Sequence, residues 1–506
     1  MKLRLVFNLA ILSLLFSVGS VQIVLAQQAP FQAFDDYVNK AMKDWEVPGM
    51  AIAVVKDDKI VYAKGYGIRE LGKTAPVDEH TIFAIGSSSK AFTAASIAML
   101  VDEGKLKWDD PVSKYLPDFQ LFDPYVTREM KVRDILTHRI GLERGDQLWY
   151  ATPYSRDEIL RRIRFLEPSS SMRSKFGYQN IMFLAAGQII PKVTQESWDD
   201  FVHDRVFTPL GMKETNTTIR DLKGKDDVAA PHQEIDGKIQ PVPYRLIDNI
   251  GPAGSINSNV VDMAQWLRLQ LGKGKYDGKQ LISEASLMEM HTPQTIIRIE
   301  GLYPIMYPDA HFMSYGMGWF LSDFRGKKLV EHGGAIDGMR ALVAMIPEEN
   351  VGVVILTNVG GTLLPQFLSY RIFDSYLEQQ PKDWQAEGLI KMKPFQAAGK
   401  AAQEKALSQR VTGSSPSLTL QNYAGSYHSE MYGDVQIDFS DGKLIAHFGP
   451  YFTGDLEHWN YDTFQVQWRD AVEGKGFMQF SLNPLGKVDS VDMGGMGKFS
   501  HVPEKK

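Results

Sequence analysis

Residues Phe83–Thr93 read FAIGSSSKAFT and open an almost wholly apolar run that ends just before Gly104. This pattern predicts a buried helix that begins near Ser87 and stops at Gly104, where a glycine can take the left-handed cap. Ser87 and Lys90 have the S-x-x-K spacing, so a helix places their side chains on one face. A hydroxyl and an amine are therefore expected side by side at a helix N-terminus, where free N–H groups and partial positive charge favour anions.

A serine in this position can be a nucleophile, with a neutral lysine as its base and backbone N–H groups to hold an oxyanion. The spacing alone is a weak signal, because serine and lysine are common residues. Its context is more informative. The polar run Gly86–Lys90 interrupts an apolar segment, and a core helix has no packing reason for such a run.

Composition restricts the classes of function. The chain has 506 residues, a net charge of -6 and no basic tract, which argues against a nucleic-acid partner. It contains no cysteine, which excludes disulfides, cysteine nucleophiles, thiolate metal sites and a lipidated bacterial N-terminus. Its hydrophobic content of 44% and charged content of 23% are ordinary for a globular protein, and its length suggests two or three domains.

Residues 1–26 are predicted to be an export signal. Lys2 and Arg4 form the charged region, Leu5–Val18 the apolar region, and cleavage is expected before Gln27. The alternative is an uncleaved membrane anchor, but the apolar run is shorter than the ~20 residues that span a bilayer. We therefore expect a periplasmic or secreted protein with no stable membrane span after signal cleavage.

Helical and strand-like patterns mix along residues 31–380. Met50–Gly65 contains two β-rich runs around a turn, which predicts a β-hairpin. Arg340–Ile346 and Val351–Asn358 are later β-rich runs that predict adjacent antiparallel strands. This order predicts an α+β domain rather than a regular βαβ alternation.

The pattern changes after this domain. Residues 381–415 are predicted to form a connecting helix, over Trp384–Arg410, followed by a linker. Residues 416–504 consist of short β-rich runs separated by turns such as Ser440–Gly442. They predict a small all-β domain in the form of a barrel.

Two further polar stretches stand at element boundaries. Tyr178 and Asn180 come directly before an apolar helix, and His332 and Gly334 precede the late strands. His138 ends another short helical segment. A single histidine carries little signal, and we expect it to be a buried residue that holds loop carbonyls rather than a catalytic group.

Together these stretches suit acyl transfer. Ser87 would attack a carbonyl, and Lys90 would have to be neutral, with its pKa lowered by burial or by a neighbouring cation. Tyr178 would relay protons to the leaving group or to the deacylating water. Asn180 would orient Lys90 and the acyl side chain.

The third stretch is expected to bind substrate. His332 would begin an edge strand that pairs with an extended substrate, and Gly334 lies in the same strand. The backbone N–H groups of Ser87 and Ala335 would form the oxyanion hole.

In this order, Ser87–Lys90, Tyr178–Asn180 and His332–Gly334 resemble the three motifs of the serine β-lactamase and penicillin-binding-protein superfamily, and the Tyr-x-Asn form resembles its class C β-lactamase branch. The resemblance covers about Phe31–Leu377. It implies a β-lactamase/transpeptidase-like domain, in which an antiparallel sheet is flanked by helices and joined by a helical subdomain. The segment 416–504 resembles the lipocalin-like barrel appended to some D-amino-acid-specific peptidases of this group.

One motif departs from the family pattern. Typical β-lactamases and D-Ala-D-Ala carboxypeptidases carry Lys-Thr-Gly where this chain has His332–Gly334, a form similar to that of related D-aminopeptidases, esterases and serine peptidases. The resemblance implies an exported serine hydrolase that forms an acyl-enzyme on Ser87 and cleaves a small peptide or amide, including D-residue peptides, or an ester. A β-lactamase or D-Ala-D-Ala carboxypeptidase is one alternative, and a non-catalytic sensor or binding module is another. No metal or organic cofactor is implied, because ligand spacing and a glycine-rich nucleotide loop are missing.

Overall fold

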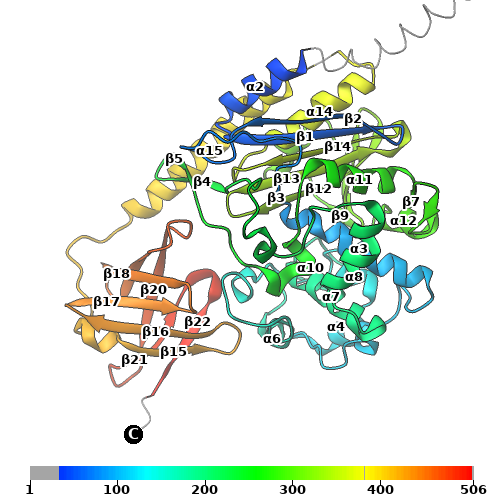
Figure 1. The fold of residues 1–506 in the computed structure, drawn as a ribbon. Helices are drawn as coiled ribbons and strands as arrows, with labels where there is room; N and C mark the ends of the chain where they lie inside the picture. The colour runs from blue at the N-terminus through cyan, green and yellow to red at the C-terminus, as the bar shows by residue number, and fades with distance from the viewer. Residues whose placement is uncertain (1–32, 381, 504–506) are drawn as a thin grey trace, which may run out of the picture.

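The described residues form an α+β domain and a separate β-barrel (Figure 1). The computed structural model describes residues 33–380 and 382–503, so the predicted export signal lies outside the described residues. The α+β fold class and the C-terminal barrel are as predicted from the sequence. In the described part of the chain, no helix combines the length and apolar character that a membrane crossing requires.

Eight antiparallel strands form the main sheet of the first domain. Across the sheet they follow the order β2 (Lys59–Gly67), β1 (Gly49–Lys56), β14 (Val351–Thr357), β13 (Met339–Ile346), β12 (Lys327–Ile336), β11 (Phe320–Phe324), β10 (Met313–Tyr315) and β9 (Thr295–Ile297). The predicted hairpin is β1–β2, and the predicted late neighbours β13 and β14 pair with Val343 opposite Val354. Pairing of β1 with β14 joins the N-terminal hairpin to these late strands.

Helices cover both faces of the sheet (Figure 1). On one face α2 (Phe34–Asp44), α14 (Leu364–Tyr376) and the start of α15 (Trp384–Ser408) share a hydrophobic cluster with Ile52 of β1. On the other face α11 (Val260–Leu271) packs in a second cluster with Ala51 and Ala53. Both faces of β1 and β14 are buried, which accounts for their almost wholly apolar sequences, GMAIAVVK and VGVVILT.

The central helix is α3 (Ser89–Asp102), and every residue of its first three turns, Ser89–Leu100, is buried. A helix without a polar face belongs in a core. Gly104 follows it at φ +69°, the left-handed cap that the sequence predicts. The other α-helices of the first domain's described residues are α4 (Pro124–Glu129), α5 (Val132–Ile135), α6 (Arg156–Arg162), α7 (Asn180–Thr194), α8 (Trp198–Val202), α9 (Thr208–Leu210), α10 (Gly251–Gly254), α12 (Glu284–Met290) and α13 (Tyr303–Met306).

Three short two-stranded sheets complete the first domain. They are β3 (Phe83–Ala84) with β6 (Asn257–Ser258), β4 (His232–Ile235) with β5 (Lys238–Pro241), and β7 (Lys275–Tyr276) with β8 (Lys279–Gln280). The pairing of β3 with β6 lies immediately before Ser87 and holds the entry to α3.

The second domain is a closed barrel of eight antiparallel strands. These are β15 (Gly425–Ser429), β16 (Gly433–Ser440), β17 (Lys443–Phe448), β18 (Phe452–Asn460), β19 (Thr463–Trp468), β20 (Lys475–Leu482), β21 (Val488–Asp492) and β22 (Lys498–Val502). Pairing of β15 with β22 closes the barrel and removes its free edges. Alternate residues point inward, as in β16, where Val435 and Ile437 are buried between exposed neighbours.

Candidate active site

Ser87 lies in the 3-10 turn η2 (Gly86–Ser88), which leads directly into α3. Lys90 stands in the first turn of α3 and is fully buried. Its Nζ lies 2.9 Å from Ser87 Oγ and 2.7 Å from the carbonyl oxygen of Ala253. The helical spacing thus brings the hydroxyl and the amine into hydrogen-bond contact.

Burial controls the charge of this lysine. Removal of Lys90 from water lowers its pKa well below the ordinary value, and the positive charge of Arg144 lowers it further. No carboxylate forms an ion pair with Lys90 in the described structure. A neutral amine at this position has a lone pair that can accept the Ser87 proton.

Tyr178 stands beside the same pair of residues. Its ring centroid lies 5.0 Å from Lys90 Nζ and 5.1 Å from the Arg144 guanidinium. Burial raises the pKa of Tyr178 above its ordinary value, and a hydrogen bond with Ser87 acts in the opposite direction. Tyr178 is therefore a protonated phenol at neutral pH, which suits a proton donor better than a base.

Asn180 is the first residue of α7 and is nearly buried. Its side-chain amide donates to Asp146 Oδ1 at 2.9 Å. The described structure contains no hydrogen bond between Asn180 and Lys90, so the predicted orientation of Lys90 by this amide is absent. The Ala253 carbonyl makes the second contact of the Lys90 amine in its place.

His332 lies in β12, and its imidazole is buried. Its Nε2 lies 2.9 Å from the Tyr315 hydroxyl, and burial, assisted by the charge of Lys90, lowers its pKa to about 3. The strand is not an edge strand as predicted, because β11 and β13 flank it. The neighbouring β11 begins with Phe320 opposite Glu331, so among the described residues the segment from His332 onward has no strand partner on that side.

Two glycines allow the backbones of η2 and β12 to touch. A Cβ atom on Gly334 would lie 1.7 Å from the Ile85 carbonyl oxygen, and one on Gly86, at φ +50°, would lie 2.7 Å from the Ala335 nitrogen. The contact places the main chains of Ser87 and Ala335 side by side. These are the two positions predicted to supply the oxyanion hole.

Two pockets meet at Ser87, and Arg144 and Ala335 line both of them. The first, here called the Asn180 pocket, has a volume of about 310 Å³ and is walled by Asn180 and aromatic side chains. The second, the Arg340 pocket, has a volume of about 230 Å³ and contains Tyr178 and His332. A substrate bound across Ser87 would therefore place one half in each pocket.

Sequence reasoning missed three charged residues of the site: Arg144, Asp146 and Arg340. Arg340 lies in β13 opposite Ala335, and its guanidinium has no hydrogen-bond or ion-pair partner among the described residues. Glu331 lines the same pocket, but its carboxyl oxygens accept hydrogen bonds from Tyr307 and Gln366. A single arginine in the otherwise apolar run 339–346 is the sequence signal that could have identified Arg340.

The barrel supports the wall of the Asn180 pocket. The ring of Tyr150, which lines this pocket, stacks on Phe452 of β18 at a centroid distance of 6.3 Å. The Tyr150 hydroxyl donates to Asp337 Oδ2 at 2.5 Å. Arg245 also contacts Asp337 Oδ2, at 3.1 Å, and reaches Asp470 of the barrel at 2.6 Å. The two domains therefore share one polar network at the site.

Comparisons with known proteins agree with this architecture. Residues 34–374 match the family model described as Beta-lactamase, and residues 409–501 match one described as a domain of unknown function, DUF3471. Unguisins hydrolase ungD of Aspergillus violaceofuscus (strain CBS 115571) is 29% identical over 518 residues, which cover 94% of this chain and 89% of the relative. Protein flp of Staphylococcus aureus (strain MW2) is 26% identical over 346 residues, 67% of this chain and 65% of its own.

Solved structures share the fold. The octameric penicillin-binding protein homologue from Pyrococcus abyssi superposes with a TM-score of 0.61 at 24% identity, over 92% of this chain and 98% of that structure. EstCE1, described as a hydrolase with promiscuous acyltransferase activity, superposes with a TM-score of 0.58 at 17% identity, over 70% of this chain and 99% of that structure. The agreement extends through both domains in the first case.

Proposed function

The chain belongs to the beta-lactamase family of serine hydrolases, and from this premise we propose that it cleaves a short peptide or amide through an acyl-enzyme on Ser87. The observation that carries the proposal is the buried Lys90 amine, 2.9 Å from Ser87 Oγ. The name of the relative from Aspergillus violaceofuscus, a hydrolase, supports hydrolysis as the class of reaction.

Acylation begins at the Ser87–Lys90 pair. The Ser87 oxygen forms a bond to the substrate carbonyl carbon while its proton passes to the neutral Lys90 amine. The carbonyl oxygen becomes an oxyanion, and the N–H groups of Ser87 and Ala335 are the donors proposed to hold it. The lowered pKa of Lys90 increases the fraction of neutral amine that is available as the base.

Tyr178 completes the step. Its hydroxyl gives a proton to the departing nitrogen, the carbon–nitrogen bond breaks, and the Lys90 proton restores the phenol. The products are the acyl-Ser87 ester and a free amine. Water then attacks the ester carbonyl while Lys90 takes a proton from the water. A proton returns to the Ser87 oxygen, and the carboxylic acid product is released.

The position of Tyr178 suggests how the substrate lies. Tyr178 lines only the Arg340 pocket, so the leaving group belongs there and the acyl part belongs in the Asn180 pocket. The unpaired guanidinium of Arg340 suits a leaving group that carries a carboxylate. The proposed substrate is therefore a peptide whose departing residue has a free carboxyl group.

A β-lactam is an alternative substrate, because the nitrogen that departs from the carbonyl carbon also lies near a carboxylate. Arg340 would bind that carboxylate in place of the lysine of the Lys-Thr-Gly motif, which this chain lacks. The purified protein should be tested on D- and L-residue dipeptides, their C-terminal amides, p-nitrophenyl esters and a chromogenic cephalosporin. Faster cleavage of free-acid dipeptides than of their amides supports the proposal. Cleavage of esters alone would reject the peptide substrate and leave an esterase.

Arg340→Gln is expected to raise KM for a free-acid dipeptide about 10–100-fold while kcat changes little, because a charged hydrogen bond to the substrate is lost. Steady-state kinetics on the free acid and on its C-terminal amide provide the measurement. Arg128→Gln, which removes an exposed arginine that lines neither pocket, is the matched control. Equal losses on both substrates would show that Arg340 does not bind the carboxylate.

Export is the second part of the proposal. The charged and apolar pattern of residues 1–26 supports a periplasmic or secreted location. Expression of the full chain in a bacterium, followed by fractionation and N-terminal sequencing, is expected to give a mature protein that starts at Gln27. An intact N-terminus in the membrane fraction would favour the uncleaved anchor instead.

A further inference from the structure

The loop after α5 holds the backbone on both sides of Tyr178. His138 in this loop adopts the left-handed region at φ +53°, which is uncommon for a residue other than glycine. Its carbonyl oxygen accepts the N–H of Gly177 at 2.9 Å, and its Nδ1 accepts the N–H of Gln179 at 3.0 Å. One residue therefore binds the two chain neighbours of Tyr178. The sequence predicted contacts with loop carbonyls, but in the structure His138 accepts from N–H groups.

The imidazole of His138 also packs on the Tyr178 side chain. The two ring centroids lie 4.1 Å apart, and the ring of Tyr315 lies 4.6 Å from His138. The Tyr315 hydroxyl in turn contacts His332. His138 thus joins the second and third polar stretches of the site through ring packing.

The proton on the imidazole has a defined place. Because Nδ1 accepts a hydrogen bond, the neutral ring carries its proton on Nε2, which is buried and has no partner among the described residues. His138 is buried, and burial and the charge of Lys90 lower its pKa well below the ordinary value. The imidazole makes no hydrogen bond to Ser87, Lys90 or the Tyr178 hydroxyl, so its geometry is that of a support and not of a base.

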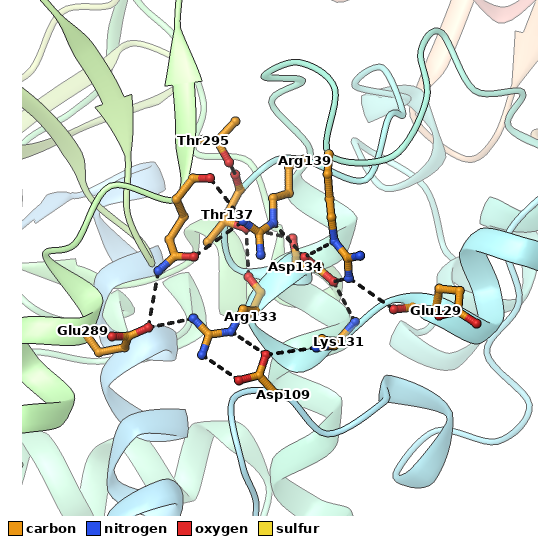
Figure 2. Close-up of polar contacts among 11 residues, drawn as sticks. Asp109, Glu129, Lys131, Arg133, Asp134, Thr137, Arg139, Glu289 and Thr295 are labelled. Atoms are coloured by element: carbon orange, nitrogen blue, oxygen red, sulfur yellow. Dashed lines mark hydrogen bonds and ion pairs between the residues drawn. The ribbon is translucent and has the colours of Figure 1, made fainter.

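A buried carboxylate anchors this loop (Figure 2). Asp134 in α5 is fully buried and accepts Nε of Arg139 at 2.6 Å and Nη2 of Arg173 at 2.5 Å. Burial alone would raise the pKa of Asp134, but the two guanidinium groups keep it below its ordinary value. The backbone N–H of Arg173 also donates to the backbone carbonyl of Arg139 at 2.6 Å. This bond joins the residue after His138 to the segment that precedes Tyr178.

The same loop is fixed to the sheet. The Thr295 hydroxyl of β9 donates to the Thr137 carbonyl at 2.7 Å (Figure 2), and Arg139 donates to the Gln294 carbonyl at 3.1 Å. His138 stands between these two anchored residues, Thr137 and Arg139. Its backbone has little freedom, and its contacts with Gly177 and Gln179 pass that restraint to Tyr178.

We propose that His138 is a positioning residue, which holds the Tyr178 hydroxyl at Ser87 so that it can protonate the leaving group. The inference rests on the proposed function, because it assigns a support to the proton donor of that reaction. The effect should depend on how much the leaving group needs a proton. An amine must be protonated to depart, whereas p-nitrophenolate leaves as an anion.

The test compares His138→Ala with His138→Asn on an amide and on a p-nitrophenyl ester. H138A is expected to lower kcat for the amide about 100-fold and kcat for the ester less than about 3-fold, following the usual size of general-acid effects. H138N should restore the amide rate to within about 10-fold, because its side-chain oxygen can replace Nδ1 and asparagine tolerates positive φ. Should H138A fail to fold, His138→Gly, which tolerates positive φ and offers no side-chain acceptor, takes its place.

His291→Asn is the matched control. His291 is also buried, but its side chain contacts Gln270 and packs on Trp319 and lines neither pocket at Ser87, so its loss should lower stability without changing the amide-to-ester ratio. Equal losses on both substrates in H138A, or no recovery in H138N, would overturn the inference. Absence of hydrolysis and of fluorophosphonate labelling in the wild-type protein would instead overturn the proposed function, so the two failures are distinguishable.

Discussion

Ser87→Ala is expected to abolish labelling by a fluorophosphonate probe and to lower turnover by about 10⁶-fold, the size of loss that follows removal of a catalytic serine. The reason is the loss of the nucleophile itself: Lys90 and Tyr178 remain in place but have no oxygen to activate. Gel-based labelling and progress curves on the best dipeptide substrate provide the measurement.

Ser96→Ala is the control for this variant. Ser96 is also buried in α3, and its hydroxyl donates only to the Phe92 carbonyl at 2.8 Å, one turn earlier in the helix. S96A should label and turn over like the wild-type protein. Labelling of S87A at the wild-type rate would reject Ser87 as the nucleophile. Absence of labelling in the folded wild-type protein would favour a non-catalytic sensor or binding module.

Lys90→Met is expected to lower kcat/KM by about 10²–10⁴-fold, the range for loss of a general base, and at the same time to raise Tm. Methionine keeps much of the buried volume but has no amine to desolvate. Removing an amine that is costly to bury should therefore stabilise the fold, an activity–stability exchange often found at active sites. Kinetics and thermal unfolding at neutral pH test both parts.

The pH dependence follows from the lowered pKa of Lys90. The unfolded chain binds a proton on this amine up to about pH 10.4, whereas the folded protein releases it at a lower pH. Between those two pKa values the unfolded state holds more protons, so the free energy of unfolding rises with pH. Activity should rise with pH through the folded-state pKa, as the base becomes neutral. The free energy of unfolding of K90M should lack this rise with pH. Near-normal turnover of K90M at every pH would remove Lys90 from the mechanism.

Local rules were sufficient for part of the site. The contact between Ser87 and Lys90 follows from one helical spacing, and Tyr178 precedes a helix whose apolar pattern is plain in the sequence. The α+β class and the barrel follow from the order of periodic segments and turns. These features depend on residues that are close together along the chain.

Features set by distant pairing were missed. Arg340 belongs to the site because β12 and β13 place it opposite Ala335, and no motif marks that register. The edge-strand prediction for His332 failed for the strand as a whole because β11, a short strand upstream, pairs with the first half of β12. Asn180 donates a hydrogen bond to Asp146. The sequence analysis assigned no role to Asp146, because the loop that contains Asp146 has no regular periodicity.

The shared network of Tyr150, Arg245 and the barrel has a consequence for biosynthesis. A growing chain produces Ser87 and Lys90 long before Phe452 and Asp470, which support the Asn180 pocket. Domains fold as units in the order of synthesis, so the nucleophile is formed before its pocket wall is supported. The support that the barrel gives to the Asn180 pocket is therefore complete only after β22 has been made and has paired with β15.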